Sequence, residues 1–333
     1  TDNTALGDGA LDDGSLSGGY NVAIGKAALG ENEGGQENVA VGWNSLDANT
    51  SGNNNSSLGS QSLSANTSGA SNTAVGKNAL RANQTGNDNV AVGQQALEDN
   101  TASNNTAVGY AAALEMTSGS NNVALGKFAL KTATTASNST CVGQNAGEDV
   151  TTAVLTAVGQ GAGKSITTGS GNTCIGQNAG QSVTTTTESV FIGGRSDGVG
   201  AGYATTGGSN TFIGSGAGSA VTSGANNTIL GRYDGNQGGL DIRGTNNYIV
   251  LSDGSGNPRL FMTNNGYIHS APTYANTSGG TANVGIASSG QFYRSTSSLR
   301  YKNTINDATH GLTELLALRP VTYKGNNDGD TVF

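Results

Sequence analysis

The residues of this 333-residue chain offer few patterns that could support chemistry. The segment GQGAGKS at 159–165 is similar to a phosphate-binding loop, but three residues separate its first Gly from the Gly-Lys-Ser, where such a loop has four. The segments SDGSGN at 252–257 and NNDGD at 326–330 lack the alternating carboxylates and the closing Glu of a calcium loop. We therefore interpret all three segments as turns.

Histidines and carboxylates do not add a site. His269 and His310 are isolated, so neither a zinc site nor a Ser-His-Asp triad has a second participant nearby. A glycan-degrading enzyme needs paired carboxylates in a groove, whereas the acidic residues are dispersed along the chain, as at 12–13 and 98–99. We expect no metal, no cofactor and no turnover enzyme.

The composition limits which elements can position a site. The chain contains 54 Gly and 3 Pro, with 11% charged and 34% hydrophobic residues. Ordinary globular proteins are about 25% charged and 45–50% apolar, so a single conventional core is not expected. Low charge argues against a disordered chain, and Gly without a three-residue period argues against collagen. The composition indicates a repeat protein built of small residues.

The charge pattern excludes two classes of partner. The net charge is −8, and the 15 basic residues are scattered, so we expect no nucleic acid as a partner. No apolar run approaches the ~20 residues of a membrane span, so we expect no membrane insertion in this segment. The sequence starts at Thr1 without a signal segment, and we expect the native N-terminus to lie upstream.

A short motif, Asn-x-small-aliphatic-Gly, recurs along the first 231 residues. Its Gly stands at positions 7, 25, 42, 59, 76, 93, 109, 126, 143, 159, 176, 193, 214 and 231. The fourteen copies are mostly 17 residues apart. A sustained period of this length is typical of a solenoid in which each copy forms one coil.

Two columns before this Gly carry apolar residues. The position directly before it is aliphatic in all fourteen copies, from Leu6 to Leu230, and we expect it to form the core. The position before that is mostly Ala and lies on the opposite face of a strand. We expect this Ala column, which includes Ala74, Ala91 and Ala107, to pack against a neighbouring chain or sheet.

Two further columns have a structural meaning. Asn stands four residues before the Gly in eleven copies, and stacked Asn side chains can form hydrogen bonds between coils. Leu stands four residues after the Gly in the first half, and Gly mostly replaces it from Gly143 onward. We expect the coil to change shape there, with Phe191, Phe212 and Ile229 in the Ala column compensating for the lost volume.

These columns predict an all-β fold. We expect a parallel β-roll or β-solenoid shaft over residues 1–231, with about fourteen 17-residue coils of two or three short strands each. A helical interpretation fails because Gly and Asn interrupt every copy before ~10 residues accumulate. Coils ~4.8 Å apart give a rod of about 65 Å. The longer spacing between Gly193 and Gly214 predicts a protruding loop at 196–208.

Both cysteines, Cys141 and Cys174, occupy the Ala column two coils apart. Their separation would be about 10 Å, beyond the ~7 Å limit on the Cα distance in a disulfide. We predict that they are buried small side chains.

The sequence motif NTAVG-x-x-AL, followed by a TSGN-like turn, resembles the head repeats of trimeric autotransporter adhesins and the shaft repeats of bacteriophage tail fibres. The resemblance covers roughly residues 1–231. It implies a parallel β-roll in a homotrimer, with three identical chains side by side about a common axis.

Residues 232–296 lack the repeat, concentrate aromatic residues and resemble the short β elements that close phage fibre shafts. In one interpretation the aromatic side chains plug the end of the solenoid. In the other they form a platform for a receptor or glycan. The candidate receptor-binding residues are then Tyr248, Tyr267 and Tyr274, with Tyr203 from the longer spacing.

Residues 297–333 resemble the start of the endosialidase-type intramolecular chaperone domain of phage tail spikes and fibres. The resemblance is carried by Ser297, by RYK at 300–302 and by RPV at 319–321. In that family the domain is a helical trimeric clamp that assists folding and then cuts itself off. The resemblance implies a short, partly helical segment in which Ser297 is the nucleophile and Lys302 the base. Ser298 departs from the family pattern, which commonly has Asp there.

Three functions from different classes fit this sequence. The first is a structural fibre of a phage or phage-like particle that projects a host-receptor or glycan-binding tip, with a C-terminal segment for trimerisation and folding. The second is a bacterial cell-surface trimeric adhesin or extracellular filament subunit. The third, a glycan-degrading spike, lacks clustered carboxylates. We therefore expect a virion fibre or a cell-surface protein, whose chemistry is at most a single self-cleavage.

Overall fold

The computed structural model describes residues 2–14, 17–195 and 197–270, and beyond them only four short strands. It divides the chain into two units, Thr1–Pro272 and Thr273–Phe333. In the second unit β20 (Val284–Ile286) pairs with β21 (Phe292–Arg294), and β22 (Tyr323–Lys324) pairs with β23 (Thr331–Val332), both antiparallel. The predicted helical part of residues 297–333 lies outside the described residues, which contain no helix.

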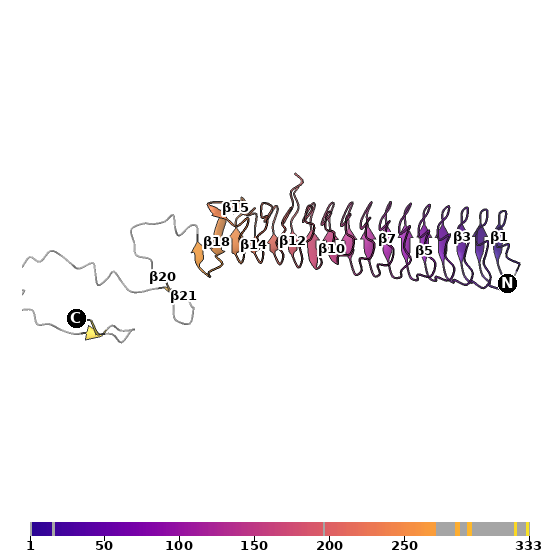
Figure 1. Ribbon diagram of the computed structural model, residues 1–333, viewed down its shortest axis with the longest axis horizontal. Helices are drawn as coiled ribbons and strands as arrows, with labels where there is room; N and C mark the ends of the chain where they lie inside the picture. The colour runs from indigo at the N-terminus through magenta and orange to yellow at the C-terminus, as the bar shows by residue number, and fades with distance from the viewer. Residues whose placement is uncertain are drawn as a thin grey trace, which may run out of the picture. The chain divides into compact units, whose positions relative to one another are not determined.

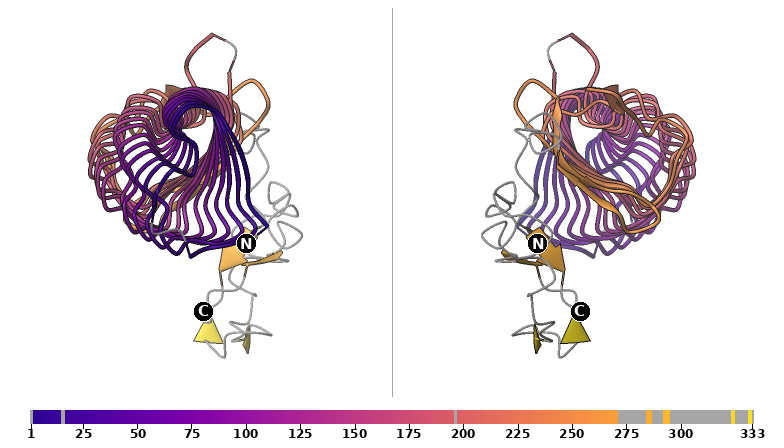
Figure 2. Two further views of the ribbon diagram at one scale, coloured as in Figure 1. Left: turned by 90° about the vertical axis from the view of Figure 1, so that its right-hand side faces the viewer. Right: turned by 90° about the vertical axis from the view of Figure 1, so that its left-hand side faces the viewer.

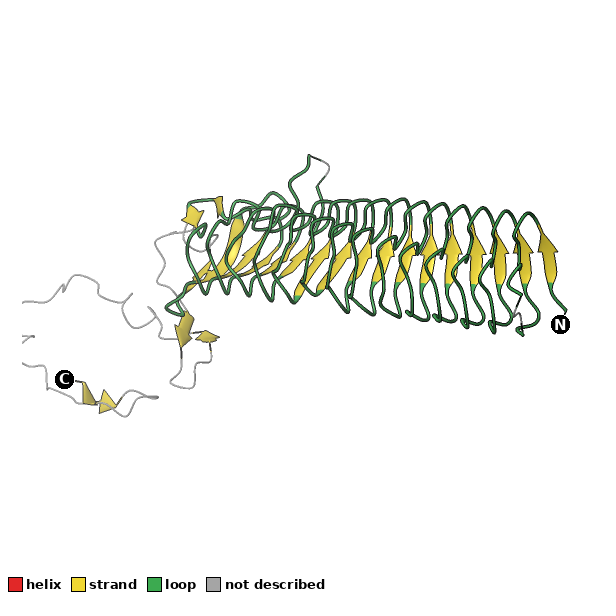
Figure 3. Cartoon of the chain, turned by 45° about the vertical axis from the view of Figure 1, so that its right-hand side comes forward, coloured by secondary structure: helices red, strands yellow, loops and turns green. Residues whose placement is uncertain are grey.

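The first unit is an all-β solenoid of about fourteen coils at roughly 17-residue spacing, as the repeat predicted (Figure 1). Each coil contributes one strand and not two or three, and turns form the rest of the coil (Figure 3). The strands pair in parallel with their neighbours along the chain. They are β1 (Thr4–Leu6), β2 (Val22–Ile24), β3 (Val39–Val41), β4 (Ser56–Leu58), β5 (Thr73–Val75), β6 (Val90–Val92), β7 (Thr106–Val108), β8 (Val123–Leu125), β9 (Thr140–Val142), β10 (Leu155–Val158), β11 (Asn172–Ile175), β12 (Val190–Ile192), β13 (Thr211–Ile213) and β14 (Thr228–Leu230).

The inside and the outside of the strands are opposite to the sequence prediction. Ala74, Ala91 and Ala107 are completely buried within the single chain, so the Ala column faces the interior of its own coil. The aliphatic residue directly before the Gly points outward, and Leu58 keeps 51% of its surface exposed. The prediction was wrong because a three-residue strand, closed by tight turns on both sides, leaves space only for a small side chain on its inner face.

The repeat Gly stands where two neighbouring coils approach each other closely. At Gly76 the backbone has φ +132°, and an added Cβ would lie 2.6 Å from the carbonyl carbon of Gly93 in the next coil. Both the left-handed backbone and this contact require glycine. The constant Gly therefore fixes the distance and register between coils.

Buried asparagines form the predicted ladder between coils. The side-chain oxygen of Asn55 accepts hydrogen bonds from the backbone N–H of Asn72 (3.0 Å) and from its side-chain amide (3.2 Å). A second ladder, which the sequence analysis missed, lies seven residues after the Gly, where Asn66 donates to Asn49 and accepts from Asn83, both at 2.9 Å. These ladders satisfy buried polar groups that the short strands leave unpaired.

The insertion between Gly193 and Gly214 does form a protruding loop, which projects from the side of the solenoid (Figure 2). The loop ends before Ala201 and does not extend to 208, because Ala201 already donates its N–H to the carbonyl of Gly193 at 2.9 Å. Tyr203 therefore lies in the regular coil, where its carbonyl accepts the N–H of Ser182. The strands on either side keep their register, with Val190 opposite Thr211.

An antiparallel cap ends the solenoid. The parallel ladder continues for one strand beyond the repeats, to β17 (Ile249–Ser252), and then turns into β18 (Pro258–Met262) and β19 (Ile268–Ser270). A small hairpin of β15 (Asn236–Gln237) and β16 (Leu240–Asp241) precedes it. Tyr233 is completely buried here, and Tyr248 and Phe261 pack against the core, as expected of an aromatic plug.

Candidate functional site: the outer stripe

The outward side chains of the strands form one continuous surface along the solenoid, which we call the outer stripe. Each of fifteen strands, β1–β14 and β17, contributes two residues to it, and none of them is charged. The column at the strand start holds Thr4, Val22, Val39, Ser56, Thr73, Val90, Thr106, Val123, Thr140, Thr156, Thr173, Val190, Thr211, Thr228 and Ile249. The column at the strand end holds Leu6, Ile24, Val41, Leu58, Val75, Val92, Val108, Leu125, Val142, Val158, Ile175, Ile192, Ile213, Leu230 and Leu251.

In a single chain, exposure of the apolar side chains of this stripe to water is unfavourable in free energy. Leu6, Leu58 and Leu230 expose 67%, 51% and 51% of their surface. Single exposed apolar residues are normal on a protein surface, whereas a contiguous row of them marks a contact surface. With strands ~4.8 Å apart, the row extends about 65 Å.

The stripe is large enough to drive association. Complete burial of a Val, Leu or Ile side chain contributes about 1.5–3 kcal/mol, and half-exposed side chains gain a part of this. Repeated over fifteen strands, the gain exceeds the roughly 4–15 kcal/mol that association costs. The backbone of the stripe is already ordered by the ladders inside the coils, so association orders few additional groups.

The predicted receptor-binding tyrosines do not converge in the described structure. Tyr203 belongs to a regular coil, and Tyr248 is half-buried against the core. Tyr267 follows the turn between β18 and β19 and exposes 67% of its surface. Tyr274, like the predicted dyad of Ser297 and Lys302, lies outside the described residues.

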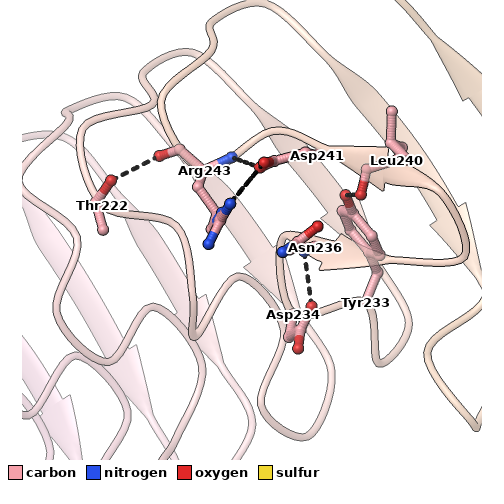
Figure 4. Close-up of polar contacts among 7 residues, drawn as sticks. All are labelled: Thr222, Tyr233, Asp234, Asn236, Leu240, Asp241 and Arg243. Carbon is pink, nitrogen blue, oxygen red and sulfur yellow. Dashed lines mark hydrogen bonds and ion pairs between the residues drawn. The ribbon is translucent and has the colours of Figure 1, made fainter.

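Polar contacts in the cap stabilise its hairpin (Figure 4). The buried Tyr233 donates its hydroxyl to the carbonyl of Leu240 at 2.9 Å, and burial raises the pKa of this hydroxyl. Arg243 donates to both carboxylate oxygens of Asp241, at 3.0 and 2.7 Å, and these hydrogen bonds hold the pKa of Asp241 below its ordinary value. Thr222 of the preceding coil donates its hydroxyl to the Arg243 carbonyl at 3.0 Å. These contacts anchor the hairpin to the last coils.

Other groups add no chemistry in the part of the chain that the structure describes. Cys141 and Cys174 are buried and unbridged, as predicted, with Ala157 between them in the ladder. Burial raises the pKa of the Cys174 thiol to about 12, so it stays protonated and inert. Among residues 2–14, 17–195 and 197–270, no three metal-ligating side chains form a cluster. The same residues include no helix that is long and apolar enough to span a membrane.

Comparison of the chain with protein-family models, with curated proteins and with solved structures finds no match.

Proposed function

We propose that this chain is the shaft subunit of a fibre of a phage or phage-like particle, in which three parallel copies associate through the outer stripe and project a host-receptor or glycan-binding tip. The observation that carries the proposal is the stripe itself, an uncharged surface whose strand-end column is apolar on every strand from β1 to β14 and on β17. The resemblance of the repeat to fibre shafts and adhesin heads supports the number of chains.

A second copy of the chain is the partner that fits the stripe best. The stripe repeats mostly Thr or Val and then Val, Leu or Ile on successive strands ~4.8 Å apart. A surface with another spacing would lose register within a few coils, whereas an identical solenoid keeps it along the whole length. Parallel copies about one axis also bring the same residues of each chain together.

Charge substitutions test this association. We expect Leu58→Asp, Val108→Asp and Val158→Asp, made together, to convert a trimer into monomers in sedimentation, because they bury carboxylates at the contact. All three side chains are at least 37% exposed in the single chain, so the solenoid itself tolerates the change. The matched control replaces Ser68, Ser118 and Thr152, exposed turn residues off the stripe, with Asp. A monomeric wild type, or equal dissociation of the control, would contradict the proposal.

The location of the protein separates a particle fibre from a bacterial surface adhesin or filament. Antibodies against the solenoid should label purified phage-like particles in electron micrographs. Labelling of whole bacterial cells, without labelled particles, would favour the adhesin instead.

Self-cleavage remains a prediction from the C-terminal resemblance. If Ser297 attacks the carbonyl of Thr296 with Lys302 as base, the mature fragment ends at Thr296. Intact-mass spectrometry of wild type beside Ser297→Ala and Lys302→Ala measures this. Equal masses for all three proteins would leave the segment with a folding or capping role only.

A further inference from the structure

An aromatic and lysine cluster lies on the turns that follow β7 and β8, beside the outer stripe. The rings of Tyr110 and Phe128 meet edge to face, with centroids 5.4 Å apart. The ammonium group of Lys127 lies 4.8 Å from the Phe128 centroid and 5.9 Å from that of Tyr110, and the ammonium of Lys131 lies 5.2 Å from the Phe128 centroid. We call these four residues the aromatic patch.

The fold does not explain the aromatic patch. Phe128 has φ 60°, and this column is left-handed in most other coils too, where it holds Asn, Gln, Ala or Gly, as at Asn44 and Gln61. A bulky aromatic side chain is unfavourable at such a position. Tyr110 exposes 43% of its surface and Phe128 is only partly buried, so neither ring belongs to the core. A strained backbone that carries a large side chain without burying it indicates a function.

The two lysines of the patch bring positive charge together and form no ion pair with the described carboxylates. Lys26 and Lys164 form ion pairs with Asp8 and Glu148, whereas no carboxylate of the described residues lies within 4.0 Å of the Lys127 or Lys131 ammonium. Both ammonium groups lie near one ring of a chain whose net charge is −8. An arrangement of this kind holds two cations in position for an anionic ligand.

We propose that the aromatic patch binds an acidic polysaccharide. A sugar ring stacks on the exposed face of Tyr110, and carboxylate or sulfate groups of the same or the next sugar accept hydrogen bonds from Lys127 and Lys131. A flexible linear polymer can reach the position, because Tyr110 and Lys127 lie on exposed turns of neighbouring coils. The inference extends the glycan-binding role of the proposed fibre and moves one glycan contact from the tip to the shaft.

Binding to defined polymers tests the patch. In affinity electrophoresis we expect the wild type to be retarded by polygalacturonate, which carries carboxylates, or by dextran sulfate, and not by neutral dextran. Retardation by only one polyanion identifies the charged group. Absence of retardation by both, or equal retardation by neutral dextran, would overturn the proposal.

Variants separate the patch from general charge effects. We expect Lys127→Gln with Lys131→Gln to weaken binding at least tenfold, and Tyr110→Ala to weaken it severalfold. The matched control, Lys26→Gln with Lys77→Gln, removes the same charge from two other coils and should bind like wild type. Equal loss in both lysine pairs, or unchanged binding in the patch variants, would refute a specific site. Sedimentation of the same variants reports association independently, so failure of the patch and failure of the proposed trimer are distinguishable.

Discussion

The early and the late coils of the solenoid fill the same backbone in two different ways. Four residues after the repeat Gly the backbone is left-handed in both halves, with φ 51° at Leu80 and 62° at Gly218. The early coils place a buried Leu at this turn and a small Ala on the strand, whereas the late coils place Gly at the turn and Phe212 on the strand. In the late coils, the large core side chain therefore stands on the strand, whereas in the early coils it stands at the turn.

The contacts of the late coils show that one coil cannot hold a large side chain both at the turn and on the strand. A Cβ added at Gly218 would lie 2.3 Å from Phe212, and one added at Gly180 would lie 2.8 Å from the sulfur of Cys174. A left-handed backbone is strained for Leu and relaxed for Gly, so the early coils accept strain to bury a large side chain. The backbone at this turn is thus left-handed in both halves, whereas the side chains that fill the core differ.

A second column changes together with the first. Seven residues after the Gly, the early coils carry the Asn49, Asn66 and Asn83 ladder, and the late coils carry Val150, Ile166 and Val183, all buried. The early half is therefore held by amide hydrogen bonds between coils, and the late half by apolar contacts at the same place.

Truncation of the large side chain in either half should have the greatest effect. We expect Phe212→Ala to cost about 3–5 kcal/mol and Leu80→Ala about 2–5 kcal/mol of local stability, because both leave a cavity in a narrow core. Since coils contact only their neighbours, hydrogen exchange should report the loss near the mutated coil. A change of less than about 1 kcal/mol would show that the coil collapses around the gap.

Introducing the Leu and Ala pair of an early coil into a late coil tests whether the two halves differ only in their core side chains. Gly218→Leu alone should destabilise the coil by about 1–3 kcal/mol, because the new Leu side chain would clash with the ring of Phe212. Combined with Phe212→Ala, it recreates the pair formed by Ala74 and Leu80. We expect the double variant to recover more than half of the summed loss in denaturant unfolding, whereas additive losses would mean that the halves differ in more than their filling.

Placing a late residue in the early ladder tests the second column. Asn66→Val should cost about 1–3 kcal/mol although Val is more apolar, because it removes the partner of the Asn49 oxygen and of the Asn83 amide. Exposed Gln94→Ala is the control and should stay within about 0.5 kcal/mol. A neutral or stabilising Asn66→Val would show that the ladder is not needed for stability.

Acid should weaken the cap slightly. Hydrogen bonds from Arg259 and from the backbone N–H groups of Asn257 and Ser255 lower the pKa of Asp253 from 3.8 to about 2. Because the folded value is depressed, the stabilisation is present above pH 3.8 and is lost as the pH falls to about 2. Hydrogen exchange of β17 and β18 between pH 4 and 2 measures it, with Asp253→Asn expected to remove the dependence.

The sequence predicted the coil period, the Asn ladder, the unbridged cysteines and the compensation of the lost Leu by Phe191 and Phe212. The expected change of coil shape is not seen at the turn four residues after the repeat Gly, where the backbone is left-handed in both halves. The sequence analysis assigned the faces of the strand wrongly, because Val or Leu is a better core residue than Ala when size alone is considered. The informative signal was Phe191 and Phe212 in the Ala column, since large aromatic side chains there indicate an inner face. The aromatic patch was missed because Tyr110 and Phe128 occupy different columns and meet only when coils stack.

Disulfide trapping tests most directly whether the outer stripe is the contact between parallel copies. Val108 lies on the stripe with 37% exposure, and the adjacent Ala107 is completely buried in its own coil. We predict that Val108→Cys forms covalent dimers on mild oxidation, seen by non-reducing electrophoresis and intact mass, because parallel copies bring identical residues together. Ala107→Cys, like the buried native Cys141 and Cys174, should stay unlinked. Absence of the Val108→Cys dimer, or equal dimer formation by Ala107→Cys, would contradict association through the stripe.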